Sequence, residues 1–207
     1  AQDLGSRSKL LQMVEDKVPV DERKFGLGCG LRPQLVNFVE CDGILINGLK
    51  FINSPFWVLH PLRSQNIIVD GVTVYNEGPN GDGCDPEACK NVIIQNCTFH
   101  TGDDCIAIKS GRNNDGRRWN TPSENIIIRH CKMEDGHGGV VIGSEISGGV
   151  RNVFAHDCYM DSPNLDRVLR IKTNTIRGGV VENIFMKDVT VGQCGESVLR
   201  INLKYEP

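Results

Sequence analysis

The sequence is poor in aromatic residues, has no excess of positive charge and contains no long apolar run. Only 6% of its 207 residues are aromatic, and 23 Lys and Arg against 26 Asp and Glu leave a formal net charge of −3. A nucleic-acid-binding protein would carry a basic footprint, so we expect no nucleic-acid partner. A membrane-spanning helix needs ~20 apolar residues, so we expect no membrane insertion. Residues 1–10 are polar and lack the apolar stretch of a signal peptide.

What the chain does have is internal repetition. A turn residue, usually Asn, is followed by three mostly apolar residues, two polar ones, a small apolar one and a β-forming residue. Copies begin 23, 25, 34, 27 and 31 residues apart, at Gly43, Asn66, Asn91, Asn125, Asn152 and Asn183. Repeats of this length indicate a solenoid or a related repeat architecture.

The repeat is built from strands rather than helices. Its runs are short, rich in β-branched residues and bounded by Gly, Asn, Asp and Pro. A second strand follows some 14–17 residues after most starts, most clearly at 105–108, 140–142, 168–171 and 198–201. Leucine-rich repeats have a tighter period, and propeller blades need about four strands each. We therefore predict an all-β protein, a right-handed parallel β-helix.

The repeats also suggest how the chain is organised. We expect residues 37–207 to form the β-helix coils that carry the catalytic face. Residues 1–36 would be an irregular N-terminal segment of the same domain, with weak helical periodicity from Ser8 to Val14. Because the ends of a β-helix must be covered and neither end resembles a cap, we expect the chain to be part of a longer solenoid.

The nine cysteines could form the disulfides of a secreted protein. Their phase favours another interpretation. Three of them lie six residues after a repeat start, where other copies have Leu or Val: Cys97, Cys131 and Cys158. We expect these to stack as small apolar core residues. Cys84 and Cys89 could bridge a loop, so the disulfide state stays open.

Unusual polar residues share a phase in successive repeats. Asp103 lies four residues after Phe99, and His137 lies four after Met133. Residues 81–84 match residues 102–105 of the following repeat, which aligns Asp82 with Asp103. Stacked coils are about 4.8 Å apart, so we expect one cluster made, coil by coil, of Asp82, Asp103 with Asp104, His137, and Arg170 with Lys172.

Each of these residues has a simpler explanation when taken alone. Asp is a common turn former, a single His is usually structural, and Arg and Lys on a strand are usually solvated. Together, however, they bring three carboxylates close to one another, and like charges at such spacing are costly unless a function retains them. Neighbouring carboxyl groups can supply an acid and a base, as glycoside hydrolysis requires. The cations suit a substrate that carries a carboxylate, so a uronic-acid polymer fits both features.

These motifs resemble those of the polygalacturonase family of glycoside hydrolases, family 28. The resemblance rests, in order, on Asn80-Gly81-Asp82, Gly102-Asp103-Asp104, Gly136-His137-Gly138 and Arg170-Ile171-Lys172, and the longer stretches 82–87, 101–112 and 135–145 are similar to bacterial members. It implies a parallel β-helix that hydrolyses α-1,4 bonds between galacturonates with inversion. It also implies a pectic polysaccharide substrate, a secreted or periplasmic location and no cofactor. We further expect a monomer.

The resemblance also implies roles for individual residues. Asp103 would be the general acid, and Asp82 and Asp104 would hold and activate the attacking water. His137 would support the acid or contact the substrate. The substrate-binding residues would be Asn80, Arg170, Lys172 and, by spacing alone, Tyr205. The first motif departs from the family, which usually has Thr where this chain has Gly81.

Two questions stay open at this point: which of three functions the chain has, and whether it acts in endo or exo fashion. An inverting hydrolase predicts carboxyl groups roughly 6.5–9.5 Å apart. A calcium-dependent pectate lyase could use the same fold, with Asp residues as Ca²⁺ ligands, and a β-helical binding module or inactive fragment would bind without turnover. Endo or exo action depends on loops that close the cleft, for which the turn 110–123, with Arg112, Arg117 and Arg118, is a candidate wall.

Overall fold

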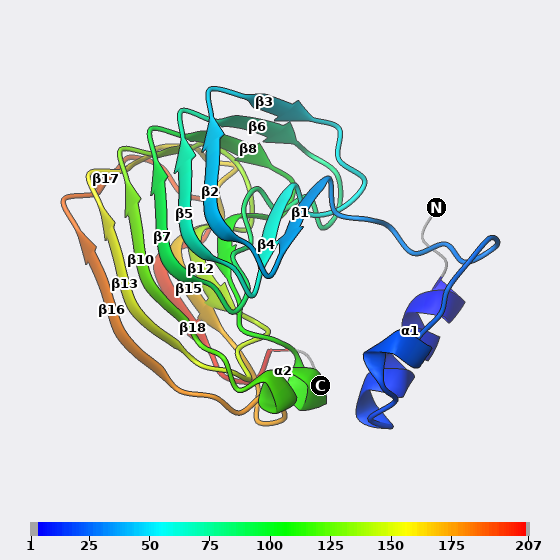
Figure 1. The fold of residues 1–207 in the computed structure, drawn as a ribbon. Helices are drawn as coiled ribbons and strands as arrows, with labels where there is room; N and C mark the ends of the chain where they lie inside the picture. Colours follow the sequence, from blue (N-terminus) through cyan, green and yellow to red (C-terminus); the bar gives the residue numbers. More distant parts are fainter. Residues whose placement is uncertain (1–3, 206–207) are drawn as a thin grey trace.

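The computed structural model describes residues 4–205 and consists mainly of short parallel strands (Figure 1). The first sheet has the order β16-β13-β10-β7-β5-β2. Its strands are β2 (Asp42–Asn47), β5 (Gln65–Asp70), β7 (Lys90–Gln95), β10 (Ser123–Arg129), β13 (Val150–His156) and β16 (Val181–Lys187). These are the predicted repeats, each paired with the repeat before it.

The second and third sheets follow the same order along the solenoid. The second contains β3 (Lys50–Ile52), β6 (Thr73–Asn76), β8 (Thr98–Thr101), β11 (Lys132–Met133), β14 (Tyr159–Met160) and β17 (Thr190–Val191). The third contains β9 (Asp104–Ile108), β12 (Gly138–Gly143), β15 (Arg167–Lys172) and β18 (Ser197–Asn202). A pair of strands, β1 (Val36–Val39) and β4 (Leu59–Leu62), extends the third sheet through bridges at Cys84. The chain therefore forms the predicted right-handed parallel β-helix.

The core lies between the three sheets and is built from rows of equivalent residues. One row contains the three cysteines that lie six residues after a repeat start. The residues that follow these cysteines pair with one another from β8 through β11 to β14, so the cysteines lie in register. Cys97, Cys131 and Cys158 are buried at 1%, 2% and 3% exposure, and all nine cysteines are free thiols. The predicted core role of these three is confirmed, because a small thiol packs like the Val and Leu of the other coils.

The Asn that opens each repeat has a structural task. Asn66, Asn91, Asn125, Asn152 and Asn183 have φ between +56° and +58°, a conformation that Asn tolerates better than most residues. From Asn91 onward, each side-chain amide donates a hydrogen bond to the Oδ1 atom of the equivalent Asn one coil earlier. This ladder holds the turns in register.

The N-terminal segment contains more structure than expected. Helix α1 spans Leu4–Glu15 and the short 3₁₀ helix η1 spans Val20–Glu22, so "irregular" is wrong for this part. Helix α1 lies against α2 (Asn113–Trp119), with the amide of Asn113 donating to Glu15 Oε1 at 2.7 Å. Within residues 4–205, no helix is long and apolar enough to cross a bilayer.

Candidate active site

The backbone register corrects one detail of the predicted alignment. Cys84 pairs with Ile106, which places Asp82 beside Asp104 rather than beside Asp103. The amide of His137 donates to the carbonyl oxygen of Asp103, as its predicted phase requires. The Asp82 coil joins the third sheet through isolated bridges at Cys84 and Glu87 instead of a full strand, one residue away from the predicted register.

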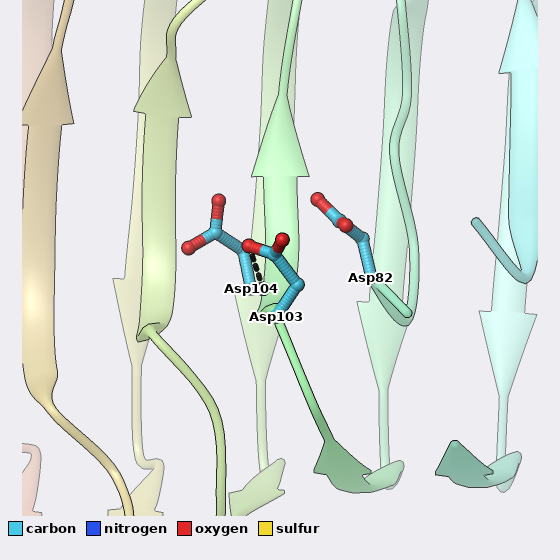
Figure 2. Close-up of side chains that lie close together, drawn as sticks. All are labelled: Asp82, Asp103 and Asp104. Atoms are coloured by element: carbon cyan, nitrogen blue, oxygen red, sulfur yellow. Dashed lines mark hydrogen bonds between the residues drawn. The ribbon is translucent and has the colours of Figure 1, made fainter. Parts of the chain in front are cut away.

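Three carboxyl groups meet on the outer face of the third sheet. Figure 2 shows Asp82 on one coil and Asp103 and Asp104 on the next, with all three side chains projecting to the same side. One oxygen atom from each lies within 4.8 Å of the others. The nearest oxygens therefore lie closer than the expected 6.5–9.5 Å, since two of the residues are adjacent and the third is one coil away.

The predicted cations lie beside these carboxylates. Lys172 Nζ is 2.6 Å from Asp104 Oδ2, and an Arg170 Nη1 atom is 3.5 Å from Asp104 Oδ1. Asp104 is fully buried, so it is stable as an anion only with such partners. The ring centroid of Tyr205 is 5.2 Å from the Arg170 guanidinium and 5.0 Å from Lys172 Nζ, which brings this spacing-based candidate into the site.

His137 contacts the residue expected to be the acid. Its Nδ1 atom is 3.1 Å from Asp103 Oδ1. This hydrogen bond is the main reason why the pKa of His137 is raised. Burial acts to raise the pKa of Asp103, but the bond from His137 and the charge of Lys172 bring it below its usual value. Arg167, which sequence reasoning missed, donates to the carbonyl oxygen of His137 at 3.2 Å.

Asp82 has the opposite electrostatic character. It is 3% exposed, and burial raises its pKa well above the usual value, opposed by Lys109 and reinforced by Asp103 and Asp104. Among the described residues, its Oδ1 atom has no hydrogen-bond partner. In the unliganded site, a proton is therefore held more readily by Asp82 than by Asp103.

The sequence analysis missed several charged residues of the site because they lie outside the four short motifs. Lys109 and Glu145 are 3.3 Å apart, and both line a pocket with Asp82, Asp103 and Lys172. Their only sequence signal was their place in long stretches similar to the family. Arg32 was missed as well; it donates to Asn80 Oδ1 at 2.7 Å and so fixes the first motif.

The pocket is open to solvent and has a volume of about 120 Å³. Arg7 of α1, Trp57 and Arg112 also line it. Arg117 instead bonds the carbonyl oxygen of Ile176, and Arg118 pairs with Asp115; neither is among the lining residues found for this pocket. Part of the predicted wall, Arg112, therefore borders the site.

The donor set suits a sugar acid better than a cation. The three aspartates could supply oxygen ligands to a metal ion. However, the ammonium of Lys172 already bonds Asp104 Oδ2 at 2.6 Å, where a divalent cation would meet like charge. Paired carboxyl groups beside fixed cations fit general acid–base chemistry on an anionic substrate.

The sequence profile described as Glycosyl hydrolases family 28 matches residues 22–207. The chain belongs to this family. It is 36% identical over 163 residues to a "Probable polygalacturonase" of Vitis vinifera, covering 77% of this chain and 33% of that protein. It is 31% identical over 181 residues to an endo-polygalacturonase of Pectobacterium carotovorum subsp. carotovorum, covering 84% and 41%.

Solved structures of the family agree with the fold. A crystal structure of a hyperthermoactive exopolygalacturonase from Thermotoga maritima superposes with a TM-score of 0.94 at 47% identity, covering 98% of this chain and 47% of that one. The chain thus spans about a third of the length of the Vitis relative and just under half of the Thermotoga protein.

Proposed function

We propose that the protein is a polygalacturonase that hydrolyses α-1,4 bonds between galacturonates in pectin. The proposal rests on one observation above all: Asp82, Asp103 and Asp104 meet at the cations Arg170 and Lys172 in one pocket. Membership of family 28 supports it. Such a group supplies an acid, a base and a binding partner for a sugar carboxylate.

In this mechanism Asp103 protonates the leaving glycosidic oxygen, while Asp82 and Asp104 hold the attacking water and take up its proton. His137 orients the Asp103 carboxyl through the bond at 3.1 Å. Asn80, Arg170, Lys172 and Tyr205 bind the substrate on either side of the bond that breaks.

The acid role requires a proton on Asp103, which the unliganded site disfavours. The substrate itself offers a remedy. Lys172 is one of the charges that lower the pKa of Asp103, and a galacturonate carboxylate bound at Lys172 would offset that charge. We therefore propose that substrate binding raises the pKa of Asp103 and so favours the protonated form that the acid role requires.

We propose that hydrolysis inverts the anomeric configuration, because the chain belongs to family 28. Carboxyl oxygens within 4.8 Å of each other do not support it through the usual separation rule. Proton NMR of the first product formed will decide: inversion gives the β-anomer of the new reducing end, and retention gives the α-anomer.

We propose that the enzyme acts on chain ends. Arg7 of α1 and Arg112, which precedes α2, line the pocket with the aspartates. The two helices are joined by the Asn113–Glu15 bond, and Arg23, which follows η1, forms an ion pair with Asp115 of α2. A wall on one side of the cleft suits exo action, and the Thermotoga protein is an exopolygalacturonase. Release of monogalacturonate alone from polygalacturonate supports this; early appearance of longer oligomers contradicts it.

The central test is Asp103→Asn, compared with the unchanged chain on polygalacturonate. We expect no release of reducing ends by the variant and an unchanged circular dichroism spectrum. Normal turnover by the folded variant would refute the acid assignment. A UV-absorbing unsaturated product, lost with chelator, would indicate a lyase. Oligogalacturonate binding without turnover by the unchanged chain would indicate a binding module.

Four further expectations remain proposals. We propose action outside the cytoplasm, where the polymer lies, and a monomeric state. We retain the division into a segment 1–36 and coils 37–207 as one domain. We also propose that the motif stretches are of bacterial type, supported by the 47% identity to the Thermotoga enzyme.

A further inference from the structure

Lys109 occupies the same register position as Lys172, two coils away. Glu87 pairs with Lys109, and Ile108 pairs with Ile142, which places Lys109 beside Gly143. Gly143 in turn pairs with Lys172. Since residues in one row of a parallel sheet project in the same direction, the two lysines flank the carboxylates of the site, separated by a residue without a side chain.

The Lys109 ammonium is buried and held from several directions. Its side chain is 4% exposed. Nζ lies 3.3 Å from the carbonyl oxygen of Gly143, 3.3 Å from Glu145 Oε2 and 4.7 Å from the ring centroid of Trp57. The side chain of Arg112, in the same pocket, is 30% exposed.

Two carboxyl groups beside Lys109 lack hydrogen-bond partners among the described residues. Asp82 is 3% exposed with an unpartnered Oδ1, and Asp85 is 0% exposed with neither oxygen bonded. Buried carboxylates without donors are costly unless a fixed cation lies close by. Lys109 is the strongest opposing charge acting on both.

We propose that Lys109 is a positioning residue for the reaction, a buried cation that favours the ionised form of the Asp82 carboxylate against the effect of burial and holds it in place to take the proton of the attacking water. This inference rests on the proposed function. Glu145 and the carbonyl oxygen of Gly143, each 3.3 Å from Nζ, hold the ammonium in the pocket that Asp82 also lines. Lys109 would thus serve Asp82 as Lys172 serves Asp104.

Other charges also act on this carboxyl group, and the test must separate them. Asp82 is influenced by Lys109, Asp103, Asp104, Lys172 and Asp85, and Lys109 by Glu145, Asp85, Asp82, Asp104 and Lys172. Of the two cations that act on Asp82, Lys109 and Lys172, only Lys109 can be removed without touching a residue already assigned to substrate binding.

The experiment compares the pH dependence of kcat/KM for the unchanged chain, Lys109→Met and Lys109→Arg. We expect Lys109→Met to move the acidic limb upward by about one pH unit or more, a loss of roughly tenfold in kcat/KM below that limb. Lys109→Arg should restore most of the profile. A uniform loss at every pH, with the limb unmoved, would overturn the proposal.

Two further variants guard against trivial outcomes. Lys90→Met removes a half-exposed lysine of β7 and should leave the profile unchanged. If Lys109→Met fails to fold, the double variant Lys109→Met with Glu145→Gln removes both charges of the buried pair and should show the same upward shift.

A readout that needs no turnover separates this proposal from the proposed function. The titration of the Asp82 carboxyl carbon, followed by NMR and assigned with Asp82→Asn, should move upward in Lys109→Met. An unmoved titration would refute the role of Lys109 even if the enzyme is active. A moved titration in a chain without hydrolytic activity would support the electrostatic role and refute the polygalacturonase assignment instead.

Discussion

Asp104 and Lys172 form a buried ion pair across the third sheet, with Nζ 2.6 Å from Oδ2 although 68 positions separate the two residues in the chain. The side chain of Asp104 is 0% exposed and that of Lys172 is 7% exposed. The pair exists because β9, β12 and β15 lie side by side, so the fold itself assembles the charges of the site.

Removal of the cation alone should destabilise the protein. We expect Lys172→Met to lower the free energy of unfolding by about 3 kcal/mol, because it leaves the buried Asp104 carboxylate with only the longer contact to Arg170. The double variant Lys172→Met with Asp104→Leu should be distinctly more stable than Lys172→Met, since both charges are gone. Urea denaturation measures both, and equal losses in the two variants would contradict the pairing argument.

The aromatic ring of Tyr205 should matter more than its hydroxyl group. The ring faces Arg170 and Lys172 at 5.2 and 5.0 Å. We expect Tyr205→Ala to reduce kcat/KM by about five- to thirtyfold, corresponding to about 1–2 kcal/mol of cation–π interaction. Tyr205→Phe should retain most of the activity. A Phe variant as impaired as the Ala variant would assign the role to the hydroxyl group.

Much of the fold was predictable because the repeat can be recognised locally in the sequence, and stacking of the repeats then places equivalent residues of successive coils side by side. The Asn at each repeat start and the cysteine row fixed the register of the first two sheets, and stacking then brought Asp103 next to His137. The third sheet was less predictable. The Asp82 coil joins it through isolated bridges, and Cys84 pairs with Ile106 instead of Cys105, so the predicted alignment was one residue off.

The electrostatics of the site could not be predicted from the motifs. Lys109 and Glu145 carry no repeat signal, and their importance comes from burial against Trp57 and the aspartates, which only packing determines. Helix α1 was largely missed for a similar reason: its weak periodicity gave little signal, and its contacts with α2 stabilise it.

The Asp103–His137 pair should give a defined pH window of stability. The pKa of Asp103 is lowered, so its contribution is present above the unfolded value near 3.9 and is lost as pH falls through the folded value. The pKa of His137 is raised, so its contribution is complete below about 6.5 and is lost as pH rises through the folded value. We expect the stability difference between the unchanged chain and His137→Asn to be largest between about pH 4 and 6.5.

NMR titration of His137 checks this directly. The ring should titrate above its ordinary value in the unchanged chain and return toward it in Asp103→Asn, because the hydrogen bond to Asp103 is the first cause of the raised pKa. An unshifted His137 in Asp103→Asn would contradict the pairing.

Gly81 should resist the Thr that the family usually carries at this position. A Cβ atom there would lie 2.5 Å from the carbonyl oxygen of Gly78, 2.6 Å from that of Asn76 and 2.8 Å from the Asn76 side-chain nitrogen. Backbone atoms cannot move aside as a flexible side chain can, so we expect Gly81→Ala to cost about 1–3 kcal/mol in unfolding free energy. Gly81→Thr should cost more. Because Asp82 follows directly, kcat/KM should fall as well.

Gly78 provides the matched control, since a Cβ atom at that position meets nothing within 4 Å. Gly78→Ala should leave thermal unfolding and kcat/KM close to those of the unchanged chain. Equal behaviour of Gly78→Ala and Gly81→Ala would show that the loop yields freely, and the tight placement of Asp82 beside Asp104 would then need another cause. If only Gly81→Ala loses stability and activity, the chain has Gly81 in place of the family's Thr because the loop before the proposed base Asp82 has no room for a side chain.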